Sequence, residues 1–161
     1  VDTNATGIEM LREEGFDVHC VDIFKLDSSH HLVKSKYDVV IVSHVIEHVP
    51  NAYDFLCTIR DMFDFDEMIL AVPNAYNYYS LLSVIIKGKE EVSNDHYHTY
   101  TPATILKFSE SLGFTVKNIY FDRDTPKIKM GKRHKILGLF QSFIRAKVFH
   151  YSGDIVLCLK K

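Results

Sequence analysis

The 161-residue chain has the length and composition of a single globular domain. Hydrophobic residues make up 47% of it and charged residues 25%, which is enough to bury a core of ordinary size. No apolar run is long enough to cross a bilayer, which argues against a membrane-spanning class. Three widely spaced cysteines in apolar surroundings, without a Cys-x-x-Cys pair, indicate buried reduced thiols, so we expect a cytoplasmic protein.

The net charge of −2 conceals a basic segment attached to an acidic body. Residues 1–120 hold nine Lys and Arg against eighteen Asp and Glu, whereas residues 121–161 hold ten against three. Within a basic amphipathic insertion at 125–150, basic and apolar residues interleave over 127–147. This pattern fits either a solvated helix packed on the domain or a peripheral contact with a membrane or an anionic substrate. No nucleic-acid-binding motif accompanies the charge, so we expect no nucleic acid partner.

Strand-like and helix-like segments alternate along the chain, which predicts one α/β domain over residues 1–161. The β-branched run Tyr37–Val42 is typical of a parallel strand buried on both faces. Thr101, Pro102 and Gly113 are the cap, first residue and stop signal of a helix. The expected elements are a helix over 4–14, an apolar run over 18–21, a strand over 37–42, a helix after Asn51, a strand over 68–72, a helix over 102–112, and antiparallel strands over 115–121 and 154–159.

His44, Glu47 and His48 form the pattern His-x-x-Glu-His, which is also the signature of one class of zinc peptidases. Those enzymes carry the pattern on a helix. Here the strand over 37–42 runs almost directly into His44, and Pro50 follows two residues after His48, so a helix has little room. The sequence therefore argues against the peptidase hypothesis. Ligands of open parallel sheets bind beyond the carboxyl ends of the strands, so the stretch is expected to lie in a binding site.

Five short motifs occur in a fixed order along the chain. They are Val1-Asp2-Thr3-Asn4, Val21-Asp22-Ile23-Phe24, the strand and loop from Tyr37 to Asn51, Pro73-Asn74, and His96 to Pro102. Together they resemble class I S-adenosylmethionine-dependent methyltransferases, specifically the small-molecule branch related to ubiquinone-type and sugar methyltransferases. The resemblance extends from Val1 to about Phe121 and to the final strand. It implies a Rossmann-like methyltransferase sheet that is mostly parallel with an antiparallel last strand, and S-adenosylmethionine as the cofactor.

The resemblance also implies which residues meet the cofactor. A carboxylate such as Asp2 accepts both hydroxyls of a ribose, although a turn or helix N-cap role is the alternative. Asp22 is placed to accept from the adenine amino group while its apolar neighbours cover the ring, and its alternative is a turn acid beside the core. The expected cofactor-binding residues are Asp2, Thr3, Asp22, Ile23, Phe24, Ser43 and His44.

Methyl transfer requires alignment of an acceptor with the methyl group and removal of a proton when the acceptor is a hydroxyl. The candidate catalytic bases are His98, then His96 and His48, and for each the alternative is a structural histidine bonded to the backbone. We assign no metal ligands, because His44 stands where ubiquinone-type relatives carry an acid, and this removes a hard oxygen ligand for magnesium. The expected reaction is methylation, at oxygen, of a small or lipid-linked acceptor.

Residues 76–100 are expected to form a substrate-side lid, either packed on the core or lining a channel for a lipid-like acceptor. No Gly-x-Gly pattern occurs, and the resemblance begins at the family's second strand. We therefore expect an amino-terminally truncated domain without the first strand and the Gly-rich loop, which would bind cofactor weakly or not at all. Its exposed strand edges could then pair in a homo-oligomer. The alternative function is a non-catalytic methyltransferase-like binding module with an incomplete cofactor site.

Overall fold

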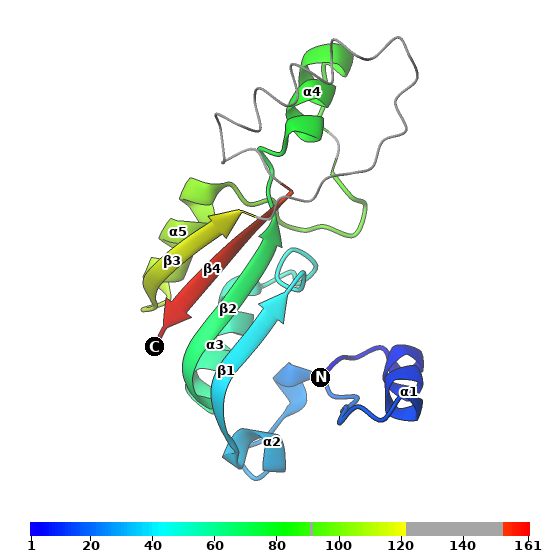
Figure 1. The fold of residues 1–161 in the computed structure, drawn as a ribbon, viewed down its shortest axis with the longest axis vertical. Coiled ribbons are helices and arrows are strands. Elements are labelled where there is room, and N and C mark those ends of the chain that lie inside the picture. The colour runs from blue at the N-terminus through cyan, green and yellow to red at the C-terminus, as the bar shows by residue number, and fades with distance from the viewer. Residues whose placement is uncertain (91, 122–152) are drawn as a thin grey trace.

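A computed structural model describes residues 1–90, 92–121 and 153–161 of the chain (Figure 1). The basic insertion at 125–150 lies outside the described residues. Among the helices that are described, none combines the length and apolar character needed to cross a membrane. The elements in chain order are α1 (Ala5–Glu13), the 3-10 helix η1 (Ile23–Lys25), α2 (His31–Lys34), β1 (Lys36–Ser43), α3 (Ala52–Met62), β2 (Asp64–Pro73), α4 (Tyr78–Lys87), α5 (Pro102–Ser111), β3 (Thr115–Phe121) and β4 (Asp154–Lys160).

Four strands form one mixed sheet in the order β1-β2-β4-β3. β1 and β2 are parallel, with Ser43 opposite Ala71, whereas β4 runs antiparallel to both β2 and β3. The prediction of a mostly parallel sheet with an antiparallel last strand is therefore confirmed. The parallel pairing of 39–42 with 69–72 is also confirmed. Within the described part of the chain, however, β1 lies at the edge of the sheet and not at its centre.

The helix ends follow from local side-chain chemistry. At the start of α5, the Thr101 hydroxyl accepts from the backbone N–H of Thr104 at 3.2 Å, and the Thr104 hydroxyl accepts from the N–H of Thr101 at 2.8 Å. Gly113 follows the helix with a φ of 83°, a left-handed conformation that glycine adopts without strain. At α1, Asn4 is the N-cap and accepts from the N–H of Gly7 at 3.2 Å. These helices confirm the sequence predictions.

The core lies between the sheet and the helices α3 and α5, which lie on the same face of it (Figure 1). Apolar residues of α3 contribute every third or fourth position, as the predicted stripe requires. The central strands β2 and β4 contribute alternate residues. The fully buried side chains that join these elements include Leu56, Met68, Leu70, Ile105, Ile155, Leu157 and Leu159.

The expectation that β1 is buried on both faces is wrong. Val42 is buried, but Val39 is 43% exposed and Ile41 is 67% exposed, so burial along the strand follows an alternating pattern. The cause is that α3 covers one face of β1, whereas α1 stands apart from the sheet (Figure 1). An unbroken apolar run therefore does not by itself establish that both faces of a strand are covered.

The apolar run over 18–21 does not form a full strand. Asp2 and Cys20 make an isolated parallel bridge, in which the N–H of Val21 donates to the carbonyl of Asp2 at 2.9 Å. This bridge brings the first two family-like motifs side by side, but it lies outside the four-stranded sheet. Cys20, Cys57 and Cys158 are free thiols, as expected, but the expectation of burial is wrong: Cys20 is exposed, and Cys57 and Cys158 are only half-buried.

We expect Leu157→Ala to lower the free energy of unfolding by about 2–5 kcal/mol, because it opens a cavity at a fully buried position of a central strand. The matched control is Ile85→Ala on α4, where the side chain is 79% exposed and the change should stay within about 0.5 kcal/mol. Urea denaturation followed by circular dichroism measures both. Equal effects of the two substitutions would contradict the assignment of the core.

Candidate functional site

The chain turns sharply where β1 ends. His44 has a φ of 53°, a left-handed conformation that residues other than glycine rarely adopt. Its backbone N–H still donates to the carbonyl of Ala71 at 3.0 Å, which extends the pairing of β1 with β2 by one residue. A turn, not a helix, then leads to Glu47 and His48. The structure therefore bears out the rejection of the zinc-peptidase hypothesis, which requires a helix at this place.

The Glu47 carboxylate is the most deeply buried charged group of this region, with only 1% of its side chain exposed. His44 Nδ1 lies 3.4 Å from Glu47 Oε1 and His48 Nε2 lies 3.9 Å from the same atom. Neither carboxylate oxygen has a hydrogen-bond partner among the described residues, because these contacts are long or poorly aligned. The two imidazoles therefore lie beside the carboxylate without satisfying it by a hydrogen bond.

The loop before α5 is tied to the same point. The backbone carbonyl of Glu47 accepts from the N–H of Tyr97 at 2.7 Å and from that of His98 at 3.3 Å. His48 Nδ1 lies 3.1 Å from the carbonyl oxygen of Asp95, and because a carbonyl only accepts, this nitrogen carries the proton. These bonds bring His96 against His48, with the ring centroids 4.7 Å apart and the rings nearly perpendicular. Two motifs distant in sequence thus meet at the end of β1.

His98, the first candidate base, is held by the backbone. Its Nε2 lies 3.1 Å from the carbonyl oxygen of Pro50 and so donates to it, which leaves Nδ1 as the nitrogen that can accept a proton. His96 and His98 line a small cavity of about 150 Å³ together with the fully buried Asn74. His48 instead lines a larger cavity on the β1 side. The three candidate bases are therefore close together but face two cavities.

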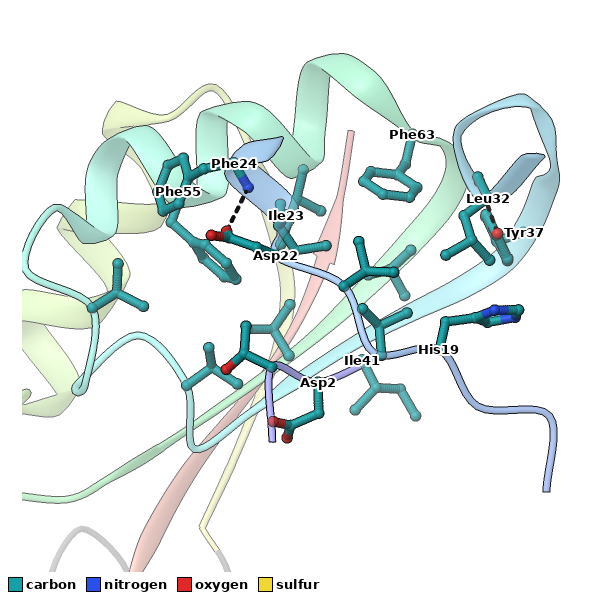
Figure 2. Close-up of a pocket in the computed structure, with 18 of the residues that line it drawn as sticks. Asp2, His19, Asp22, Ile23, Phe24, Leu32, Tyr37, Ile41, Phe55 and Phe63 are labelled. Carbon is teal, nitrogen blue, oxygen red and sulfur yellow. Dashed lines mark hydrogen bonds between the residues drawn. The ribbon is translucent and has the colours of Figure 1, made fainter. Parts of the chain in front are cut away.

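The larger cavity has a volume of about 1030 Å³ and runs along β1 (Figure 2). One wall is β1 with α3, and the other is formed by residues 1–3 and 17–24, which the Asp2–Cys20 bridge holds together. Ser43 does not line it, although its neighbours Val42 and His44 do. The remaining six expected cofactor-binding residues all line this cavity: Asp2, Thr3, Asp22, Ile23, Phe24 and His44.

Both expected acids make local turn contacts. Asp22 accepts from the N–H of Phe24 at 3.0 Å, as drawn in Figure 2, and from Lys25 Nζ at 3.1 Å. The Lys25 bond, followed by the backbone bond, holds the pKa of the Asp22 carboxyl below its ordinary value. Asp2 accepts from the N–H of Asn4 at 2.8 Å. Both acids therefore make the turn contacts that the sequence offered as the alternative to cofactor binding. Both side chains nevertheless line the cavity.

Phe24 offers an aromatic surface beside Asp22. It is 52% exposed and packs edge-on against Phe55, with ring centroids 5.8 Å apart. Sequence analysis placed Phe55 in the core stripe of α3 and missed that it also lines the cavity. It likewise missed Asp95, which orients His48. The available signal was its position directly before His96 in a motif already singled out.

The sequence matches no known family model and no curated protein. Solved structures with a similar fold include a SAM-dependent methyltransferase from Archaeoglobus fulgidus, which is 21% identical over 95% of this chain and 72% of its own, with a TM-score of 0.58. The small RNA methyltransferase HEN1 is 13% identical over 99% of this chain and 19% of its own, with a TM-score of 0.63. Magnesium protoporphyrin IX methyltransferase from Synechocystis PCC 6803, solved with bound SAH, is 14% identical over 95% of this chain and 57% of its own, with a TM-score of 0.51.

At these identities the likeness establishes the fold. The mixed sheet with its antiparallel β4 is that of Rossmann-like S-adenosylmethionine-dependent methyltransferases, as the motifs predicted. This chain spans less than two thirds of two of the three relatives. The fold alone therefore leaves open the activity, the acceptor and any branch among the methyltransferases.

Tyr100 gives this site a measurable alkaline titration. Burial, and next the negative charge of Glu47, raise the pKa of Tyr100 from 10.0 to about 12. Folding therefore favours the neutral phenol. Its contribution to the free energy of unfolding is fully present below pH 10 and is lost as the pH rises from 10 to 12. The loss should approach about 3 kcal/mol.

We expect Tyr100→Phe to flatten that part of the dependence of unfolding free energy on pH. The control is Tyr120→Phe, which removes a tyrosine that is 54% exposed and should leave the profile unchanged. Urea titrations at several pH values between 9 and 12 measure the effect. A wild-type profile that Tyr100→Phe does not alter would contradict the raised pKa of Tyr100.

Proposed function

We propose that the protein transfers the methyl group of S-adenosylmethionine to an oxygen of a small or lipid-linked acceptor. One observation carries the proposal: six of the seven residues expected to meet the cofactor line one cavity beside β1, although they come from three separate segments. The fold supports the same conclusion, because ligands of open α/β sheets bind at the carboxyl ends of parallel strands. His44 lies at such an end.

The two walls of the cavity supply complementary chemistry. Asp2 is exposed and Asp22 is half-buried, and both carboxylates are suited to hydroxyl and amino donors. Phe24 offers an aromatic face to a purine ring. Histidines stand at the far end, beside the smaller cavity. A cofactor lying along β1 with its methyl group toward His48 would meet an acceptor entering from the side of His96 and His98.

The acceptor's class is supported only by the walls of the smaller cavity. Its lining includes Asn77, Ser80 and Thr99 in addition to His96 and His98, which suits a hydroxyl-bearing molecule. A lipid-linked acceptor remains within the proposal through the apolar residues of α4, where Val84, Ile85 and Ile86 are exposed. HEN1 is a small RNA methyltransferase, but its similarity in fold does not make RNA the acceptor proposed for this chain.

We expect the 161-residue chain to bind S-adenosylhomocysteine weakly, with a Kd above about 100 µM, because it contains no Gly-x-Gly turn to bring backbone amides to the ligand. Asp2→Asn and Asp22→Asn should each weaken binding about 10-fold further by removing a charged acceptor. Asp66→Asn, on the exposed side of β2 and outside the cavity, is the matched control. Calorimetry at high protein concentration measures all four proteins.

Two outcomes separate the alternatives. Absence of binding at about 10 mM ligand by a folded chain would favour a non-catalytic module and overturn the proposal. Micromolar affinity that depends on Asp2 and Asp22 would support the cofactor site and show that the glycine turn is dispensable.

A second prediction concerns the base. If His98 accepts the acceptor's proton, His98→Gln should lower turnover by roughly 10²-fold. Glutamine can still donate to the Pro50 carbonyl, so the backbone contact of the loop is retained. His98→Ala loses both functions. Near-normal turnover for His98→Gln, with a loss only for His98→Ala, would assign a structural role to His98. Labelled methyl transfer to acceptor mixtures, with calorimetry of cofactor binding, makes the distinction.

A further inference from the structure

We propose that Glu47, His48 and His96 bind a divalent transition metal of the zinc type. Their candidate ligand atoms, one carboxylate oxygen and two imidazole nitrogens, all lie within 4.8 Å of one another. An ion about 2.0–2.2 Å from each ligand would hold the three atoms roughly 3.4 Å apart. Small side-chain rotations therefore suffice to close the site, and His48 Nε2 already lies 3.9 Å from Glu47 Oε1.

The burial of Glu47 is an independent observation that favours a cation beside it. Its side chain is 1% exposed, and both oxygens are buried without a hydrogen-bond partner among the described residues. Removing a carboxylate from water in this way is unfavourable by several kcal/mol unless positive charge compensates for it. The imidazoles of His44 and His48 do so only when protonated, whereas a divalent ion does so while they are neutral.

The orientation of His48 is the one that metal binding requires. Because its Nδ1–H donates to the carbonyl of Asp95, its Nε2 carries the lone pair, and this is the nitrogen that lies near Glu47. A metal-bound histidine usually donates its other ring N–H to a carbonyl or carboxylate in the same manner. The Asp95 carboxylate also approaches Nδ1, at 3.3 Å. His96 is supplied by the same loop, directly after Asp95.

The donor set selects the class of metal. Two imidazoles and one carboxylate suit zinc, cobalt or iron, whereas magnesium prefers near-octahedral oxygen ligands. His44 is not needed as a ligand: its Nδ1 lies 3.4 Å from Glu47 Oε1, and its Nε2 faces Asp154 Oδ2 at 3.4 Å. We assign it a positioning role for the Glu47 carboxylate. This site differs from the magnesium site against which the sequence argued, because its third ligand comes from the loop before α5.

Three protein ligands leave coordination positions open, and the ion would lie between the larger cavity, lined by His48, and the smaller one, lined by His96. An acceptor hydroxyl bound there would lose its proton more readily. That role rests on the proposed methyl transfer. Metal binding itself does not, so titrations without cofactor distinguish failure of the metal site from failure of the methyltransferase proposal.

The test is a titration of the chelator-treated 161-residue chain with Co²⁺, followed by displacement with Zn²⁺. We expect one equivalent of Co²⁺ to produce a visible absorption band, and stoichiometric Zn²⁺ to abolish it. Millimolar Mg²⁺ should have no effect. A colourless Co²⁺ titration, or equally effective competition by Mg²⁺, would overturn the proposal.

Variants assign the ligands. His96→Ala, His48→Ala and Glu47→Gln should each weaken Zn²⁺ binding by at least about 10-fold and alter the Co²⁺ spectrum. The matched control is His31→Ala, because His31 lies in a separate imidazole group, with His30 at 4.5 Å and His19 at 5.0 Å between ring centroids. Circular dichroism verifies that each variant folds. If Glu47→Gln does not fold, His96→Ala is the decisive variant, because His96 is only half-buried in a loop outside the hydrophobic core. Loss of binding in His31→Ala, or full binding in a folded His96→Ala, would place the metal elsewhere and refute the assignment.

Discussion

The burial of Glu47 at the end of β1 is the constraint on which the rest of the site depends. Its backbone carbonyl accepts from Tyr97 and His98 and so fixes the loop before α5, while its side chain lies among imidazoles beneath that loop. A buried carboxylate without hydrogen bonds opposes folding. The packed sheet and α3 must therefore provide the free energy that holds it in place. Among the described residues, two serine hydroxyls, those of Ser83 and Ser109, are also buried without a partner, but Glu47 is the only charged side chain in that state. Unsatisfied buried charges are typical of functional positions.

His44 adds a second unfavourable feature at the same point. A left-handed conformation at a residue with a β-carbon costs roughly 1–2 kcal/mol. It is retained because the His44 N–H completes the pairing with Ala71, which the parallel ladder of β1 and β2 enforces. The turn directs the imidazole toward Glu47 and toward Asp154 at the start of β4. Backbone strain here accompanies a side-chain position that extended backbone would not give, which fits the clustering of strained residues at functional sites.

Sequence reasoning succeeded where the determining forces are local. The starts of α1 and α5 follow from Asn4 and Thr101, and the stop after α5 follows from Gly113, because caps and left-handed turns involve neighbouring residues. It failed for the outer face of β1, because the exposure of Ile41 depends on where α1 lies, and no pattern within the strand records that.

The candidate site divides in the same way. The residues beside β1 could be predicted from motifs at strand ends, and the structure gathers Asp2, Asp22 and His44 around one cavity. The grouping of Glu47 with His96 could not be predicted from spacing, because it depends on hydrogen bonds between two loops distant in sequence. Nor could the hydrogen bond of His98 to Pro50, which decides which ring nitrogen is available.

The two roles considered for Asp22 do not exclude each other. Its bond to Lys25 is an ion pair at the surface, and such pairs contribute little to stability because water and salt screen them. The bond to the N–H of Phe24 uses the other carboxylate oxygen and fixes the side chain's direction. A ligand amino group can therefore replace Lys25 at small cost while the backbone bond keeps the acid oriented. A turn acid beside an exposed aromatic ring is thus already preorganised for binding, because little conformational freedom remains to be lost.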